Sequence, residues 1–186
     1  MIIKRFNAVL SLITILLLLT HIGYTSFAYL TMYYNPLMTK VFSIPFMVSV
    51  CIHGVLGMSQ VFMNSDGTAL GSYPKLNRAT LMQRLSAALI FPLVFVHVNT
   101  FGYMQANAES GTIGVIILLM ATEILLFAAA LCHASISFSR ALITLGLLTS
   151  RDTQKKIDRI FLIAAMVILA IASFAVVRGQ AIMFIH

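Results

Sequence analysis

Charged residues are scarce in this chain of 186 residues: only 9% are Asp, Glu, Lys or Arg, and tryptophan is absent. Hydrophobic residues make up 60%, a share too high for a soluble globular domain, and that class is excluded. Cysteine occurs only twice, as Cys51 and Cys132, and both lie inside long apolar runs. A disulfide scaffold and the Cys-x-x-Cys-His attachment of c-type haem are therefore excluded as well.

The net charge of +7 does not indicate a protein that binds nucleic acid. Such a protein needs Lys and Arg clustered on a solvated surface, whereas here they are dispersed between apolar segments. A hydrocarbon core about 30 Å thick takes roughly 20 helical residues to cross, so the chain has room for five crossings and for no second domain. We therefore expect a single domain, residues 1–186, embedded in the lipid bilayer.

Five apolar stretches have the length of a membrane span. They are predicted to be helices, because a backbone inside lipid must form its own hydrogen bonds and none of them alternates with the two-residue period of a barrel strand. The first is too long for the apolar region of a typical signal peptide, so we expect it to be retained. The spans are approximately Phe6–Thr31, Val41–Met63, Leu81–Met104, Thr112–Leu148 and Ile157–Ile185.

The basic residues predict the orientation of the chain. If the N-terminus lies inside, Lys40 and Arg178 fall on the outer side and all the other basic residues fall on the inner side. Since Lys and Arg accumulate on the cytoplasmic side, this bias favours a cytoplasmic N-terminus and an external C-terminus. The inner-side residues are Lys4, Arg5, Lys75, Arg78, Arg84, Arg140, Arg151, Lys155, Lys156 and Arg159.

Histidines occur inside each of the first four predicted helices. A single histidine at membrane depth is ordinarily explained by a hydrogen bond between helices. Four of them in consecutive helices favour a functional explanation, because ionisable groups are costly in lipid and mark functional sites. These four are His21, His53, His97 and His133, while His186 is the last residue of the sequence.

The rise of about 1.5 Å per helical residue places the four histidines at two depths. His53 and His133 lie about 14 and 10 Å from the predicted cytoplasmic edge. His21 and His97 lie about 15 and 10 Å from the opposite edge. The histidines therefore form two pairs, each drawn from two different helices, with one pair in the inner half of the membrane and one in the outer half.

Two pairs at two depths favour two stacked b-type haems. Ligation of a haem iron by two histidines needs one imidazole on each face of the macrocycle, from different helices. A zinc site would instead need three or four ligands at one depth. A flat ring between helices also needs small residues beside it, and the inner pair is flanked by Gly54, Gly57, Ala129, Ala130 and Ser137.

Two further residues are candidates for the chemistry of such a site. Arg140 follows His133 by seven residues, two turns on the same face, where its guanidinium could bind the propionates of the inner haem; a snorkelling anchor is the alternative. Glu123 is the only carboxylate away from the ends of the predicted spans and lies at the level of His21 and His97. We expect Glu123 to hold or relay a proton for quinone chemistry, with an interhelical hydrogen bond as the alternative.

This pattern resembles the dihaem cytochrome b that anchors succinate dehydrogenases and fumarate reductases in the membrane, in its form with one polypeptide and five helices. The resemblance covers essentially the whole chain. It rests on one histidine in each of the first four helices, on Leu81-Met-Gln-Arg-Leu-Ser86 ahead of His97, and on HASISFSRALITLG, which runs from His133 to Gly146.

The resemblance implies a function and a set of partners. It assigns His53 and His133 to the haem nearest a cytoplasmic iron–sulfur subunit, and His21 and His97 to the outer haem. It further implies a flavoprotein subunit, menaquinone as the membrane quinone, and the bacterial inner membrane as the location. The chain would pass electrons in a succinate:quinone oxidoreductase or quinol:fumarate reductase without catalysing the dicarboxylate step, since it has no flavin motif, iron–sulfur cysteine cluster or nucleotide loop.

Three other interpretations stay open at this point. The chain could be the cytochrome b anchor of another membrane-bound oxidoreductase, such as a hydrogenase or a formate dehydrogenase. It could be a haem-free transporter whose intramembrane histidines relay protons or bind a metal. It could also be a purely structural anchor in which the histidines form only interhelical hydrogen bonds.

Overall fold

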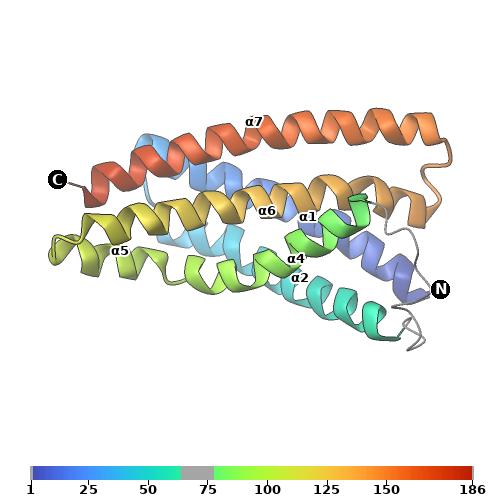
Figure 1. Ribbon diagram of the computed structural model, residues 1–186, viewed down its shortest axis with the longest axis horizontal. Coiled ribbons are helices and arrows are strands. Elements are labelled where there is room, and N and C mark those ends of the chain that lie inside the picture. The colour runs from blue at the N-terminus through green and yellow to red at the C-terminus, as the bar shows by residue number, and fades with distance from the viewer. Residues whose placement is uncertain (1, 64–77, 186) are drawn as a thin grey trace.

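The computed structural model describes residues 2–63 and 78–185, and these residues are almost entirely helical (Figure 1). Lys75, most of the connection Asn64–Arg78 and the terminal His186 lie outside the described residues. The helices are α1 (Ile2–Thr31), α2 (Pro36–Met63), α4 (Arg78–His97), α5 (Thr100–Glu109), α6 (Ile113–Leu145) and α7 (Arg151–Phe184).

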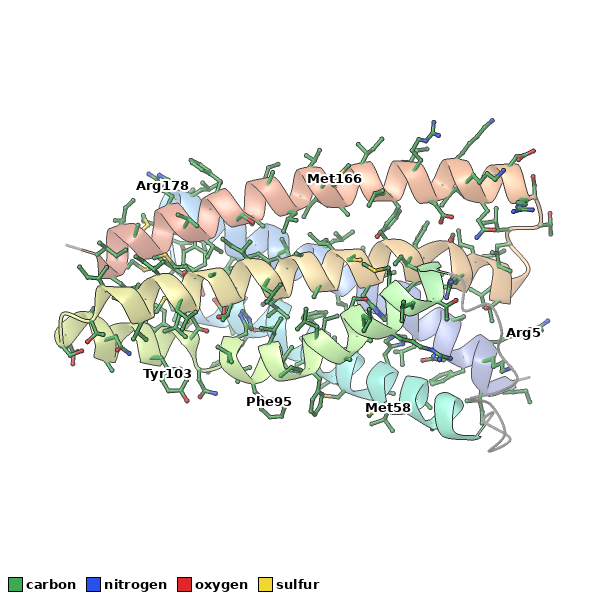
Figure 2. The ribbon with its side chains drawn as sticks, in the orientation of Figure 1. Arg5, Met58, Phe95, Tyr103, Met166 and Arg178 are labelled. Carbon is green, nitrogen blue, oxygen red and sulfur yellow. The ribbon has the colours of Figure 1, made fainter. Side chains whose placement is uncertain are left out.

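All of these helices except α5 are long and apolar enough to cross a membrane, which makes five candidate spans in the described part of the chain. Their outward faces are apolar as well: Met58, Phe95 and Met166 point away from the bundle (Figure 2) and are each more than half exposed. In water such surfaces would be costly, whereas lipid tails cover them without penalty. The prediction of an all-helical chain with five membrane-length helices is confirmed.

The ends of these helices are set by local chemistry rather than by hydropathy. Helix α2 begins at Pro36, and the Asn35 side chain accepts hydrogen bonds from the next two backbone N–H groups, at 3.0 and 3.2 Å. Helix α6 ends where Gly146 adopts a left-handed φ of 78°. Helix α7 is capped by Ser150, and it therefore begins in the charged segment ahead of the predicted span.

The third predicted span differs from the structure. In place of one helix over Leu81–Met104, the chain forms α4 and α5, which are separated by a turn between His97 and Thr100. Side chains stabilise this turn: the Asn99 amide donates to the Phe95 carbonyl at 2.9 Å, and the Thr100 hydroxyl donates to the Val96 carbonyl at 3.0 Å. Such bonds to the preceding turn compete with the regular helical pattern and bend helices.

The packing of the helices leaves α2 at one side of the molecule. Helix α1 packs against α2, α6 and α7, and α4 packs against α5 and α6. Within the described residues, the backbone of α2 lies close to that of α1 alone, and none of its Cα atoms comes within 8 Å of a Cα atom of α4 or α6. Helices α2 and α6, and likewise α1 and α4, are therefore brought together by side chains and not by close backbone packing.

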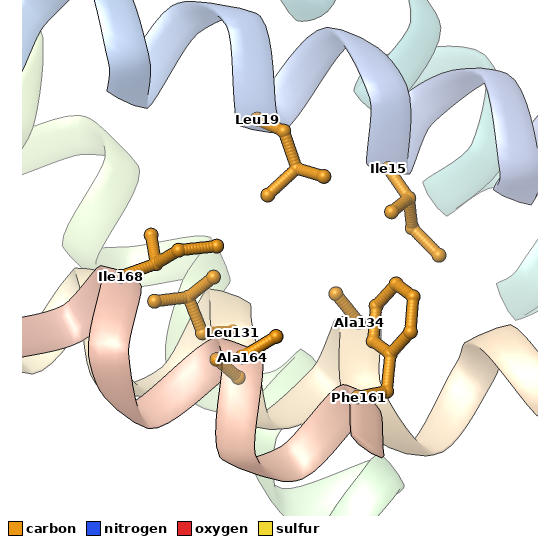
Figure 3. A pocket seen from close by; sticks show the side chains of 8 residues that line it. Ile15, Leu19, Leu131, Ala134, Phe161, Ala164 and Ile168 are labelled. Carbon is orange, nitrogen blue, oxygen red and sulfur yellow. The ribbon is translucent and has the colours of Figure 1, made fainter. Parts of the chain in front are cut away.

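The main hydrophobic core lies between α1, α6 and α7, and its buried residues include no titratable group. Its buried residues include Ile15, Leu18, Leu131, Ala172 and Val176. An apolar cavity of about 110 Å³ lies within it (Figure 3). Because it is lined by apolar side chains, the cavity offers no partner to a polar ligand. The cavity is lined by Ile15, Leu19, Leu131, Ala134, Phe161, Ala164, Ala165 and Ile168.

Candidate functional site

The rings of His53 on α2 and His133 on α6 face each other across the space between their helices. Their centres are 6.3 Å apart, and their planes cross at 68°. Both side chains are half-buried. The two helices make no close backbone contact, so these rings join α2 to α6 through side chains.

Each ring of this pair uses its Nδ1 atom for a hydrogen bond to a neighbouring helix. His53 Nδ1 lies 3.0 Å from Asn7 Oδ1 on α1, and His133 Nδ1 lies 3.0 Å from the Gln83 carbonyl oxygen on α4. The Ser86 hydroxyl lies 3.4 Å from the same His133 atom. When an acceptor binds the Nδ1–H group, the neutral imidazole keeps its lone pair on Nε2. Both rings are therefore fixed with Nε2 available as a ligand atom.

The second pair of histidines joins α1 and α4. The rings of His21 on α1 and His97 on α4 have their centres 6.3 Å apart and their planes at 85°. The His21 ring also stacks on Phe46 of α2, with 5.4 Å between the ring centres. This pair likewise joins two helices whose backbones are not in contact. The structure thus brings the four predicted histidines together as two pairs with equal ring separations.

Glu123 on α6 places a carboxylate next to His97, a member of the second pair. It is only 4% exposed, and its two oxygens have separate partners. Oε2 lies 2.6 Å from His97 Nδ1, and Oε1 accepts a hydrogen bond from the Thr100 hydroxyl at 2.9 Å. His97 and Thr100 stand on either side of the turn between α4 and α5, so this turn presents both donors to the same carboxylate.

Arg140 lies near the first pair, at the end of α6 where α7 begins. Its guanidinium donates to the Gln83 side-chain oxygen and, at 3.0 Å, to the Thr80 hydroxyl, both on α4. The Gln83 amide in turn donates to the Ser137 hydroxyl at 2.8 Å. These contacts use two of the five N–H donors of a guanidinium, and the others are left for an anionic ligand.

The ring separation can be compared with what a shared metal ion requires. Two imidazoles on opposite sides of one iron, each with its nitrogen about 2 Å from the metal and its ring centre about 1.2 Å further out, have ring centres roughly 6.4 Å apart. Both pairs have ring centres 6.3 Å apart. The partners of His53, His97 and His133 also fit, because the remaining ring nitrogen of a metal-binding histidine normally donates to a carboxylate or carbonyl oxygen.

The same geometry does not suit a zinc site. A structural zinc ion takes four ligands, and a catalytic one takes three. Within residues 2–63 and 78–185, no group of three or more His, Cys, Asp or Glu side chains converges on one point. Two imidazoles alone suit a macrocyclic cofactor, in which the other four positions on the metal are filled by the cofactor itself.

Several residues of the site were not predicted from the sequence, among them Asn7, Gln83 and Thr100. One signal could have indicated two of them, since Asn7 precedes His21 by fourteen residues and Gln83 precedes His97 by the same number. Fourteen residues make about four helical turns, so each pair lies near one face of its helix and about 21 Å apart along it. No comparable spacing signal marks Thr100.

The space beside Gly54 and Gly57 on α2 is open, because a Cβ atom added at either position would meet nothing within 4 Å. Gly57 lies one turn after His53, on the same helix face. If a flat cofactor lies against this face, Gly57→Leu should reduce the haem content of the purified chain by about half. Val55→Leu is the matched control, since Val55 is 62% exposed, and two haems should be retained. Full haem content in Gly57→Leu would contradict the prediction.

Comparison with protein-family models, with curated proteins and with solved structures finds no match for this chain. A functional conclusion therefore depends on the paired histidines and their hydrogen-bond partners.

Proposed function

We propose that the chain is a dihaem cytochrome b and the membrane anchor of a succinate:quinone oxidoreductase or quinol:fumarate reductase. One observation carries the haem part of the proposal. Two histidine pairs on four helices have the same ring separation of 6.3 Å, and it matches the separation required by an iron atom bound between two imidazoles.

The residues of the inner site would hold one haem through His53 and His133. Asn7 and the Gln83 carbonyl keep the two rings oriented, with Nε2 free to bind the metal. Arg140 stands at the cytoplasmic end of this site and has donors left for a propionate. The basic residues around the start of α7 favour the same end as the cytoplasmic side, where the iron–sulfur and flavoprotein subunits would bind.

The residues of the outer site would hold the second haem through His21 and His97. Glu123, which is itself buried, accepts hydrogen bonds from His97 Nδ1 and from the Thr100 hydroxyl. When bound, the two haems supply one-electron transfer between the iron–sulfur subunit and a membrane quinone, for which menaquinone is the candidate. Glu123 is the candidate for holding or relaying the accompanying proton.

The test is the haem content of the chain purified from a membrane. A pyridine haemochrome assay and a reduced-minus-oxidised spectrum should give two b-type haems per polypeptide. A chain without a Soret band would overturn the proposal and favour a haem-free transporter that relays protons or binds a metal through its histidines. The proposed enzyme class is tested by the subunits that copurify: a flavoprotein with succinate or fumarate activity supports it, and hydrogenase or formate dehydrogenase subunits would overturn it.

A further inference from the structure

The hydrogen-bond partners of the two histidine pairs differ in charge. In the inner pair, His53 and His133 bond to the amide oxygen of Asn7 and the backbone carbonyl of Gln83, which are both neutral. In the outer pair, His97 bonds to the carboxylate of Glu123 at 2.6 Å, the shortest of these contacts. The two sites therefore have the same histidine ligands but differ in the charge of the groups that accept hydrogen bonds from those histidines.

The charge of this partner affects the metal through the imidazole ring. An anionic acceptor on Nδ1–H draws the proton toward itself and raises the electron density on Nε2. A more strongly donating ligand stabilises the oxidised iron, which carries the higher positive charge, relative to the reduced iron. The reduction potential of a haem ligated in this way is therefore lower than that of the same haem with a neutral acceptor.

We infer that Glu123 is a positioning residue that lowers the reduction potential of the outer haem through its hydrogen bond to His97. The inference rests on the proposed function, since it needs a haem at this site. The assignment is geometric: the carboxylate is 4% exposed, both of its oxygens are occupied by donors from α4 and α5, and His97 is one of those donors. Glu123 acts on the iron only through His97.

Thr100 weakens the hydrogen bond between Glu123 and His97. Its hydroxyl donates to the other oxygen of Glu123 and so takes up part of the negative charge that would otherwise face His97. Without that donor, the carboxylate is a stronger acceptor for the His97 ring. Removal of Thr100 and removal of the Glu123 charge should therefore shift the outer haem in opposite directions, an outcome that a general loss of packing would not produce.

The decisive experiment is a redox titration of the complete chain with both haems bound, followed by optical absorption. Glu123→Gln keeps the shape and an acceptor oxygen but removes the charge, and it should raise the midpoint potential of the outer haem while the inner haem keeps its value. Thr100→Val should lower the outer potential. The two transitions are assigned from the His133→Ala variant, which should retain only the outer haem.

The reciprocal variant introduces a carboxylate acceptor at the inner pair. Asn7→Asp replaces the neutral acceptor of His53 with a carboxylate of nearly the same shape, and it should lower the potential of the inner haem and leave the outer one unchanged. If Glu123→Gln loses the outer haem, Asn7→Asp still decides whether a carboxylate on a ligand histidine sets the potential in this bundle.

The possible results distinguish failure of the proposed function from failure of the role of Glu123. If the unmodified chain binds no haem, the proposed function itself is overturned. If it binds two haems and Glu123→Gln retains both with an unchanged outer potential, the proposed function stands and the role of Glu123 is overturned. Equal shifts of both haems in Glu123→Gln would also overturn it, because they would indicate a change in the bundle as a whole.

Discussion

Replacement of His133 by alanine should remove one haem from the chain and leave the other in place. His133 is a member of the inner ring pair, and alanine offers the iron no ligand on that side. The outer pair lies on another level of the bundle and shares no ring with it. We expect the haem content to fall from two per polypeptide to one, measured by pyridine haemochrome on the purified variant.

The companion variants of this prediction test the pairing itself. His53→Ala should cause the same loss as His133→Ala, and the double variant should lose no more than either single one. Cys132→Ser is the matched control, because Cys132 is next to His133 in sequence and is only partly buried, and two haems should be retained. Loss of both haems in His133→Ala, or of neither, would refute the pairing of His53 with His133.

Substitution of Gly179 by leucine should destabilise the packing of α7 against α1. A Cβ atom at this position would come within 2.8 Å of the Tyr29 Cβ atom and would also collide with the Tyr29 ring. The Tyr29 Cβ atom is attached directly to the backbone of α1, so the clash cannot be relieved by rotation of the ring, and the helices must separate. Overpacking of this kind costs about 1–3 kcal/mol. The measurement is the midpoint of unfolding in detergent by heat or by added SDS.

Gly23 provides the control for this substitution. It lies on α1 like Tyr29, and a Cβ atom there would meet nothing within 4 Å. Gly23→Leu should therefore leave the unfolding midpoint close to that of the unmodified chain. If Gly179→Leu were equally well tolerated, close approach of α1 and α7 at this point would not contribute to stability. A stabilised Gly179→Ala variant would lead to the same conclusion, because alanine already carries the clashing Cβ atom.

The membrane-length helices could be predicted from the sequence because hydropathy and length are properties of single segments. The turn between His97 and Thr100 could not be predicted in this way, since it depends on hydrogen bonds from Asn99 and Thr100 to the preceding turn. Such bonds leave no mark on a hydropathy profile. The start of α7 was missed for a similar reason, because the helix extends through a charged segment to its cap at Ser150.

The candidate site was only partly accessible from the sequence. Helical rise alone assigned the histidines to two levels, and it placed Glu123 at the level of His97. The bond between Glu123 and His97 depends also on how α4 and α6 are rotated against each other, and one sequence does not contain that information. The contact of Gln83 with His133 could not be predicted either, because the acceptor is the backbone carbonyl oxygen, which every residue type carries.

Among the described helices, the backbone of α2 lies close to that of α1 alone, so in the proposed dihaem chain the cofactors would fill the gap between α2 and its other neighbours. Lipid gives helices little drive to associate, and an unfilled gap between α2 and α6 would be occupied by acyl chains as readily as by protein. Porphyrin supply would then limit maturation of the newly inserted polypeptide. If the chain anchors soluble subunits as proposed, they would find a finished docking platform only in cells able to make enough of the pigment.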